Sequence, residues 1–278
     1  MSGPSERPEP RKPAEPKPHI DTQTAHAARV YDFLSGGEVN FAVDREVAEI
    51  QARAYGRDDG TRARRDIRAQ REFIGKVVGY CASEGGVRQF LDVGSGIPSE
   101  HHLHRLAQQG TPDARMVFVD NDDIVLTHAH QLLPNTDDAA ARFVQADFFE
   151  PDTVLQAAAG TLDFTQPIAL LLIALTHLHG DERHPYETVA RYVDALSSGS
   201  YLAMTNLSSD IEPEATEPLK RAMDGANIDY GFALRSKAEF ARFFEGLDLV
   251  EPGIVPVSAW HAEVDFVAPL WSAVARKP

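Results

Sequence analysis

The chain has 278 residues, of which 43% are hydrophobic and 25% charged; 27 basic residues stand against 42 acidic ones, giving a formal net charge of −15. This composition is typical of a globular protein, and the length suits one large domain or one domain with an appendage. The acidic balance disfavours a general nucleic-acid binder, whose affinity depends on cationic contacts to phosphate. The single cysteine excludes an intrachain disulfide framework, and no apolar run reaches the roughly 18 residues of a membrane span. We therefore expect a cytoplasmic protein with neither a membrane nor a nucleic-acid partner.

The N-terminal third contains a tail and a helical segment. Residues 1–19 are rich in Pro, Glu, Arg and Lys, without the apolar stretch of a secretory signal, and are expected to be disordered. Residues 20–84 carry apolar side chains at helical spacing, interrupted by glycine-containing segments. We expect helices over residues 25–34, 44–54 and 62–82, which together form an N-terminal helical extension.

From residue 85 to residue 278 the pattern changes, because short β-branched or aromatic runs now alternate with helical ones. Strands are expected over residues 88–93, 115–119, 142–145, 167–174, 200–206, 247–251 and 270–276. Helices are expected over residues 100–109, 124–133, 153–159, 186–196, 217–223 and 236–244. This alternation predicts an α/β fold with a Rossmann-like, doubly wound sheet of seven mostly parallel strands. The last two strands have too short a connection for a crossover helix, so we expect them to pair antiparallel at one edge.

The first predicted strand ends in an acidic residue and a glycine-rich turn. Its sequence runs through Asp92, Gly94, Ser95 and Gly96 into a helical pattern, so two glycines can let the backbone approach a ligand closely. The second predicted strand closes with Asp120, at the position that reaches the ribose hydroxyls of a nucleoside in doubly wound folds.

The third predicted strand is also followed by an acid, Asp147, so three successive strands carry an acid at one edge of the sheet. Taken alone, the two glycines indicate no more than a turn, and each acid no more than a solvated strand end. Their order along the chain favours a nucleoside site. The turn holds no cationic residue and is interrupted by Pro98, so a pyrophosphate fits it poorly and a positively charged ligand fits better.

These residues resemble the class I methyltransferases that use S-adenosyl-L-methionine (SAM). The matching motifs are Asp92 to Gly96, Asp120, and Asp147 with Phe148. More narrowly, the chain is similar to an actinobacterial family of S-adenosyl methyltransferases, formerly a domain of unknown function (DUF574). That narrower match lies in residues 28–37, 40–41, 44–45, 88–98, 119–122 and 162–167, with further matches at 243–247, 250–253 and 255–258.

The resemblance implies a methyltransferase domain over residues 85–278, with strand order 3-2-1-4-5-7-6 and an antiparallel last strand. It implies that residues 94–96 pass under the methionine part of SAM and that Asp120 binds the ribose diol. Asn121 would lie beside the adenine, Asp147 would accept a hydrogen bond from its amino group, and Phe148 would lie against its ring. The end of the fourth strand, from Ala174 to His177, would line the sulfonium region. The implied reaction is methyl transfer to an acceptor, which we expect to be a small molecule.

An acceptor that bears a proton can require a general base. His177 and His179 follow the fourth predicted strand, where a base would stand, although a helix cap or a solvated loop is the simpler explanation for them. Asn206 and Tyr230 are further candidates. The sequence leaves the acceptor, the need for a base and the oligomeric state open.

The segment around Tyr31 and Asn40 mixes aromatic, amide and glycine residues. It is interpreted either as a cover that closes over the cofactor, with Tyr31 and Asn40 as ligands, or as a helix pair packed beside the sheet. Among the arginines of the third predicted helix, Arg71 is the one expected to reach the cofactor carboxylate. Cys81 is expected to be a small buried hydrophobe.

The histidines His101, His102 and His104 follow the glycine turn, and two of them share a helix face. Without a third ligand nearby, they indicate a solvated face rather than a metal site. Two other functions remain open for the whole chain: a SAM-binding regulatory protein without turnover, and a nicotinamide-dependent oxidoreductase on the same type of sheet.

Overall fold

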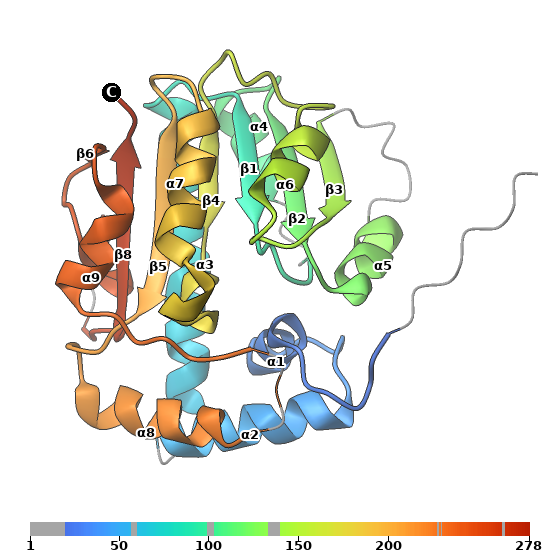
Figure 1. Cartoon of the computed structure of the whole chain (residues 1–278), viewed down its shortest axis with the longest axis vertical. Helices are drawn as coiled ribbons and strands as arrows, with labels where there is room; N and C mark the ends of the chain where they lie inside the picture. Colours follow the sequence, from blue (N-terminus) through green and yellow to red (C-terminus); the bar gives the residue numbers. More distant parts are fainter. Residues whose placement is uncertain are drawn as a thin grey trace, which may run out of the picture.

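The computed structural model describes residues 20–56, 60–98, 103–132, 140–226, 228, 230–262 and 265–278. The predicted tail over residues 1–19 lies outside them. The described part is an α/β fold in which one twisted sheet has helices on both faces (Figure 1). No helix in these ranges is both long enough and apolar enough to cross a membrane.

The sheet confirms the predicted class and order. Its strands are β1 (Gln89–Val93), β2 (Arg115–Asp120), β3 (Ala141–Gln145), β4 (Ala169–Leu172), β5 (Tyr201–Leu207), β6 (Asp248–Leu249), β7 (Val255–Pro256) and β8 (Leu270–Arg276). They run in the order β3-β2-β1-β4-β5-β8-β6, with β7 also paired to β8. The first five strands are parallel, and β8 is antiparallel to β5, β6 and β7. The predicted sixth and seventh strands are β6 and β8, and the two-residue β7 is an addition.

Successive side chains of a strand point to opposite faces of the sheet, and here each face has its own core. Because both faces are covered, β1, β4 and β5 are buried along their whole length. On β1, Phe90 packs into the core beneath α3, whereas Leu91 packs into the core beneath α6 and α7. Covered on both faces, these central strands hold their carboxyl ends in fixed positions.

Helices cover both faces and the carboxyl edge of the sheet (Figure 1). The α-helices are α1 (Ala27–Leu34), α2 (Ala42–Gly56), α3 (Thr61–Ser83), α4 (Leu103–Gly110), α5 (Asp123–Leu132), α6 (Pro151–Ala158), α7 (Pro185–Ala195), α8 (Pro213–Asp224) and α9 (Lys237–Ala241). Short 3₁₀ turns are η1 (Thr176–Leu178), η2 (Asp181–Arg183), η3 (Arg242–Phe244) and η4 (Val257–Ala259). Below the carboxyl edge, α2 lies alongside α8, with α1 between them and the sheet (Figure 1).

Several predicted elements have different bounds, for local reasons. The strand predicted over residues 167–174 ends at Leu172, because Ala174 takes a left-handed conformation, with φ 57°, and the chain then enters η1. The helix predicted over residues 236–244 divides into α9 and η3. Ser236 starts it with a reciprocal capping box to Glu239. The shortened β4 places the segment that follows it at the opening below the sheet.

Candidate functional site

The glycine turn after β1 is tied to β2 by its own backbone. The N–H groups of Gly94 and Ser95 both donate to the Val119 carbonyl oxygen, at 2.8 and 3.0 Å. Gly94 and Gly96 have φ values of 75° and 66°, in the left-handed region that side chains disfavour. At Gly94 an added Cβ would also lie 2.8 Å from Leu175 Cδ1. Glycine is therefore favoured at this position both by the backbone conformation and by the close approach of the Leu175 side chain, which precedes η1.

Two buried carboxyl groups flank this turn. Asp120 accepts hydrogen bonds from the Gly96 N–H (2.8 Å, Oδ2) and the Asp122 N–H (3.0 Å, Oδ1). Burial raises the pKa of the Asp120 carboxyl, although these two hydrogen bonds oppose the shift. Burial, and secondarily the charge of Asp120, raises the pKa of Asp92 to about 7. The turn therefore lies in an acidic environment that a cationic ligand would stabilise.

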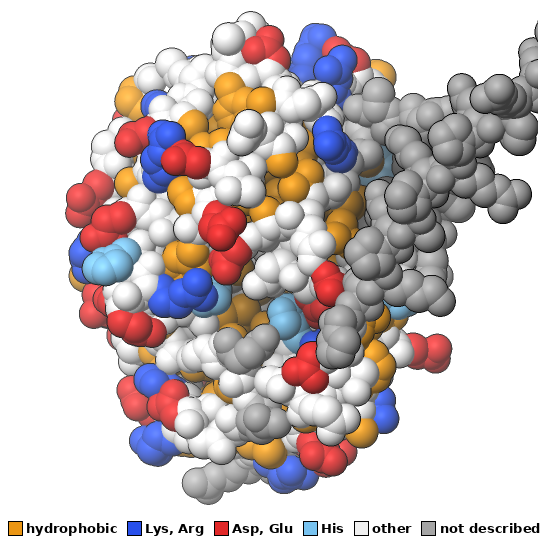
Figure 2. All heavy atoms as spheres, turned by 45° about the vertical axis from the view of Figure 1, so that its right-hand side comes forward, with side chains coloured by type: hydrophobic (Ala, Val, Ile, Leu, Met, Phe, Trp, Pro, Cys, Tyr) orange, Lys and Arg blue, Asp and Glu red, His pale blue; other side chains and the backbone are white. Residues whose placement is uncertain are grey.

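A cavity of about 680 Å³ opens below the turn, between the carboxyl edge of the sheet and helices α1, α2, α3 and α8. Figure 2 shows hydrophobic side chains at the base of a hollow on one face of the molecule. Of the residues singled out in the sequence as site candidates, the cavity brings together Tyr31, Asp92, Gly94, Ser95, Gly96, Ala174 and His177, together with Arg71 and Tyr230. It does not include Asn40, Asp120, Asn121, Asp147, Phe148 and His179.

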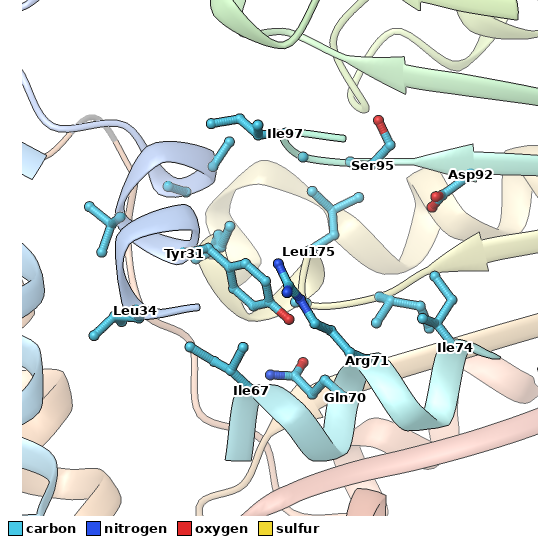
Figure 3. Close-up of a pocket in the computed structure, with 18 of the residues that line it drawn as sticks. Tyr31, Leu34, Ile67, Gln70, Arg71, Ile74, Asp92, Ser95, Ile97 and Leu175 are labelled. Atoms are coloured by element: carbon cyan, nitrogen blue, oxygen red, sulfur yellow. The ribbon is translucent and has the colours of Figure 1, made fainter. Parts of the chain in front are cut away.

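Arg71 of α3 and Tyr31 of α1 form the polar centre of this cavity, and their side chains point toward one another (Figure 3). The Arg71 guanidinium carbon lies 5.8 Å from the centroid of the Tyr31 ring. Burial raises the pKa of Tyr31 to about 12, and the neighbouring guanidinium partly offsets that shift. Within the described ranges, no carboxylate forms an ion pair with Arg71, so the guanidinium can receive an anionic group of a ligand.

Within the part of the chain that the structure describes, two buried polar atoms on the cavity wall have no hydrogen-bond partner. They are Ser95 Oγ, in the glycine turn, and His177 Nδ1, in η1. Buried polar atoms in folded proteins are normally paired, so each of these atoms is available to a bound molecule.

The two candidate bases separate in space. His177 lines the cavity near Phe232, at 6.0 Å between ring centroids, whereas His179 lies edge-on to Phe149, at 4.8 Å, outside it. Burial lowers the pKa of His177 to about 3 and that of His179 to about 4, with nearby arginines adding to both shifts. Both imidazoles are neutral at pH 7 and bind a proton weakly.

The predicted adenine-side residues lie beside β2 and β3. Asn121 is exposed, and Asp147 Oδ1 accepts from the Phe149 N–H at 2.9 Å, while its Oδ2 lies 3.6 Å from Arg183 Nη2. Phe148 is buried and stacked on Tyr192, with 5.7 Å between ring centroids.

Two candidate amides are engaged within the protein. Asn40 Nδ2 donates to Asp32 Oδ2 and to the Gly37 carbonyl. Asn206 Oδ1 accepts from Thr176 and Arg235, and its Nδ2 donates to two carbonyl groups. Both amides therefore hold loops in place.

Sequence reasoning missed a buried network that fastens α1 beside the site. Asp122 Oδ2 lies 3.1 Å from both His26 Nδ1 and Arg29 Nε, and Arg29 Nη1 lies 3.8 Å from Asp44 Oδ2. Since the Asp122 N–H also donates to Asp120, this network joins α1 directly to the acidic residue at the end of β2. No periodic spacing connects these positions, although Asp122 stands two residues after Asp120.

The remaining candidates are simple to place. Cys81 is buried, as predicted, and burial raises the pKa of its thiol to about 12. His101 and His102 lie outside the described residues. The predicted solvated helix face is wrong for His104, which is buried, edge-on to Phe118 at 6.4 Å between ring centroids.

The sequence and the fold of the chain both have counterparts among known proteins. A profile of the S-adenosyl methyltransferase family matches residues 13–277. The crystal structure of a DUF574 family protein from Streptomyces avermitilis MA-4680 is similar at 39% identity, covering 94% of this chain and 100% of that one, with a TM-score of 0.86. A protein of Thermobifida fusca YX, provisionally described as a methyltransferase, is similar at 32% identity, covering 95% and 99%, with a TM-score of 0.84.

A more distant structure shares the fold alone. It is an O-methyltransferase family protein from Burkholderia thailandensis, with 12% identity, coverage of 79% of this chain and 59% of that one, and a TM-score of 0.51. No curated protein matches the chain. The family profile spans nearly the whole sequence, and the described residues have the matching fold. The chain therefore belongs to the S-adenosyl methyltransferase family, and its cofactor is S-adenosyl-L-methionine.

Proposed function

We propose that the chain transfers the methyl group of SAM to a small-molecule acceptor held in the cavity below the sheet. The observation that carries this proposal is the glycine turn between two buried acids, opening onto a cavity whose wall holds Arg71. A net charge of −15 favours a small acceptor over a nucleic acid. When bound, the cofactor supplies a methyl group on a positively charged sulfur, which keeps the electron pair of the broken bond as the acceptor takes the methyl group and loses a proton.

The residues around the turn fit the separate parts of this cofactor. The Asp120 carboxylate, already oriented by two backbone N–H groups, would accept hydrogen bonds from the ribose hydroxyls. Arg71 would bind the carboxylate of the methionine part, which is the anion that its surroundings lack. Asp92 would lie near the positive charge of the cofactor. We further propose Asn121, Asp147 and Phe148 for the adenine, at the ends of β2 and β3.

The protein would act mainly by positioning and by excluding water. His177 is the imidazole that faces the cavity, and its lowered pKa makes it a poor acceptor for a full proton. It is better suited to orienting the acceptor through a hydrogen bond. The acceptors that suit this site are those whose nucleophile needs little help to lose its proton.

Helix α1 would serve as the cover of the site. It contributes Tyr31 and Leu34 to the cavity wall and is held by the ion pairs of Arg29. This arrangement favours the cover interpretation of the N-terminal helices, with residues 20–84 closing the site of the domain formed by residues 85–278.

Calorimetric titration of the full chain with S-adenosylhomocysteine (SAH) tests the proposal. We expect one site per chain, and at least tenfold weaker binding in Asp120→Ala, because two charge-assisted hydrogen bonds of about 1.5–3 kcal/mol each are lost. Asp113→Ala, which removes an exposed aspartate paired with Arg88, is the matched control and should bind as the unmodified chain does. Absence of SAH binding to the unmodified chain would exclude the proposal, whereas SAM binding without consumption across a broad acceptor panel would favour a regulatory protein.

A further inference from the structure

The cavity continues well beyond the region that the cofactor would occupy. We call this continuation the distal chamber and define it by Leu34 of α1, Tyr55 of α2, Ala63, Asp66 and Ile67 of α3, Leu219 of α8, and Phe232. Ala63 precedes Arg71 by eight positions on the same helix, which places it about 12 Å further along the axis at 1.5 Å per residue. If Arg71 marks the carboxylate end of the cofactor, the distal chamber is left for a second molecule.

The walls of the distal chamber are mainly apolar, apart from the Asp66 carboxylate and the Tyr55 hydroxyl. Leu34, Leu219 and Phe232 are 3%, 2% and 7% exposed, so what remains of their surfaces faces the chamber rather than solvent. Helices α2 and α8 lie side by side below the sheet (Figure 1). Each contributes to the chamber wall, α2 through Tyr55 and α8 through Leu219. A ligand that fills the chamber therefore gains free energy mainly by burying apolar surface.

The described wall of the distal chamber offers no unpaired charge. The charged residue on it, Asp66, accepts a hydrogen bond from the Tyr55 hydroxyl at 2.6 Å and forms an ion pair with Arg65 at 3.0 Å. A ligand charge placed there would lose its hydration without gaining a counterion, which is costly in an apolar enclosure. The chamber therefore discriminates against both cationic and anionic molecules.

His177 lies between the glycine turn and the distal chamber: it follows Leu175, whose side chain lies against Gly94, by two residues, and its ring lies beside Phe232 of the chamber wall. Among the described residues, its buried Nδ1 has no hydrogen-bond partner. A ligand in the chamber can pair this nitrogen with one polar group, and that group would then lie on the side of the cavity nearest the glycine turn. This is the position in which a methyl acceptor atom is needed.

We propose that the distal chamber is the acceptor site, and that the acceptor is an uncharged, predominantly apolar molecule whose hydroxyl group is directed to His177 and receives the methyl group. This proposal rests on the function proposed above. Transfer to the hydroxyl oxygen forms a carbon–oxygen bond, breaks the carbon–sulfur bond with its electron pair left on sulfur, and releases the hydroxyl proton to solvent. A phenolic hydroxyl suits the site better than an aliphatic one, because it loses its proton more readily without a strong base.

The first test compares three probes of similar shape and different charge on the full chain, saturated with SAH: 1-naphthol, 1-naphthoate and 1-naphthylmethylammonium. We expect 1-naphthol to bind at least tenfold more tightly than either charged probe in calorimetric titrations at pH 7.5. Equal or tighter binding of a charged probe would overturn the proposal, as would the absence of 1-naphthol binding to a chain that binds SAH. A chain that binds no SAH would instead refute the proposed function.

The second test fills the distal chamber. Ala63→Leu adds three carbon atoms to a residue that faces the chamber, and should weaken 1-naphthol binding at least tenfold while SAH affinity changes less than threefold. Ala238→Leu, at an exposed position of α9 outside the cavity, is the matched control and should leave both affinities unchanged. Unaltered 1-naphthol binding to Ala63→Leu would place the acceptor elsewhere and overturn the proposal.

Discussion

Without bound ligand, the variant Asp92→Asn should become progressively more stable relative to the unmodified chain as pH rises from 5 to 7. In the folded chain, burial and the charge of Asp120 raise the pKa of the Asp92 carboxyl from 3.8 to about 7. The folded state therefore holds a proton that the unfolded state has already released between these two pH values. The unmodified chain loses stability over this window as pH rises, and the asparagine variant lacks that loss.

The magnitude follows from the width of the shift. Each pKa unit corresponds to 1.36 kcal/mol, so a shift from 3.8 to about 7 gives a total contribution of about 4 kcal/mol, of which roughly 2–3 kcal/mol falls between pH 5 and pH 7. The histidines with lowered pKa, His177 and His179, titrate alike in both proteins and cancel in the difference.

Urea unfolding of both proteins at pH 5, 6, 7 and 8 measures this difference, with Asp248→Asn as the control at an exposed position. The gap between Asp92→Asn and the unmodified chain should widen up to pH 7 and then level off, whereas the control should show a constant gap. Two parallel curves for Asp92→Asn would refute the argument, because they would show that Asp92 ionises at the same pH in the folded and the unfolded states.

Three further predictions concern the cofactor contacts and the cover. Arg71→Met should weaken SAH binding by about tenfold or more, because a charge-assisted hydrogen bond of about 1.5–3 kcal/mol is lost, but it should leave binding of 5′-methylthioadenosine, which has no carboxylate, unchanged. The control Arg68→Met should change the affinity for neither ligand. If Arg71→Met weakened the binding of SAH and of 5′-methylthioadenosine equally, the assignment of Arg71 to the cofactor carboxylate would be refuted. Gly94→Ala combines left-handed backbone strain of about 1–2 kcal/mol with a close contact to the Leu175 side chain. Its melting temperature should therefore fall further than that of Gly246→Ala, which has similar backbone strain but no atom within 4 Å of the added Cβ. Arg29→Leu leaves two buried carboxylates without their partner and should cost about 3–5 kcal/mol in urea unfolding, and a loss below 1 kcal/mol would contradict the role given to this network.

The sequence predicted the sheet well because its signals are local. The strand over residues 115–119 and the apolar strand beginning at residue 167 appear as β2 and β4, and the acids that end the first two strands meet at one edge of the sheet. Strand β7 was not predicted, because two residues are too few to form a periodic pattern. The early end of β4 depends on the left-handed conformation of Ala174, which the residue type does not announce.

The site was predictable where one motif places its residues, and not where distant segments meet. The glycine turn and Asp120 lie together because they end neighbouring parallel strands. The contact between Arg29 and Asp122 joins residues 93 positions apart, and no spacing along the chain encodes it. Similarly, His177 and His179 are separated by one residue in the sequence but lie in different places, because η1 directs His177 into the cavity and His179 toward Phe149.

We propose above that the carboxyl edge of the sheet holds the cofactor between the glycine turn and α3. A crystal structure of the full chain with SAH would show whether it does. We expect the ribose hydroxyls to lie within hydrogen-bonding distance of the Asp120 carboxylate and the ligand carboxylate to contact Arg71. A ligand bound elsewhere on the molecule, or bound at this edge with its carboxylate turned away from Arg71, would contradict it.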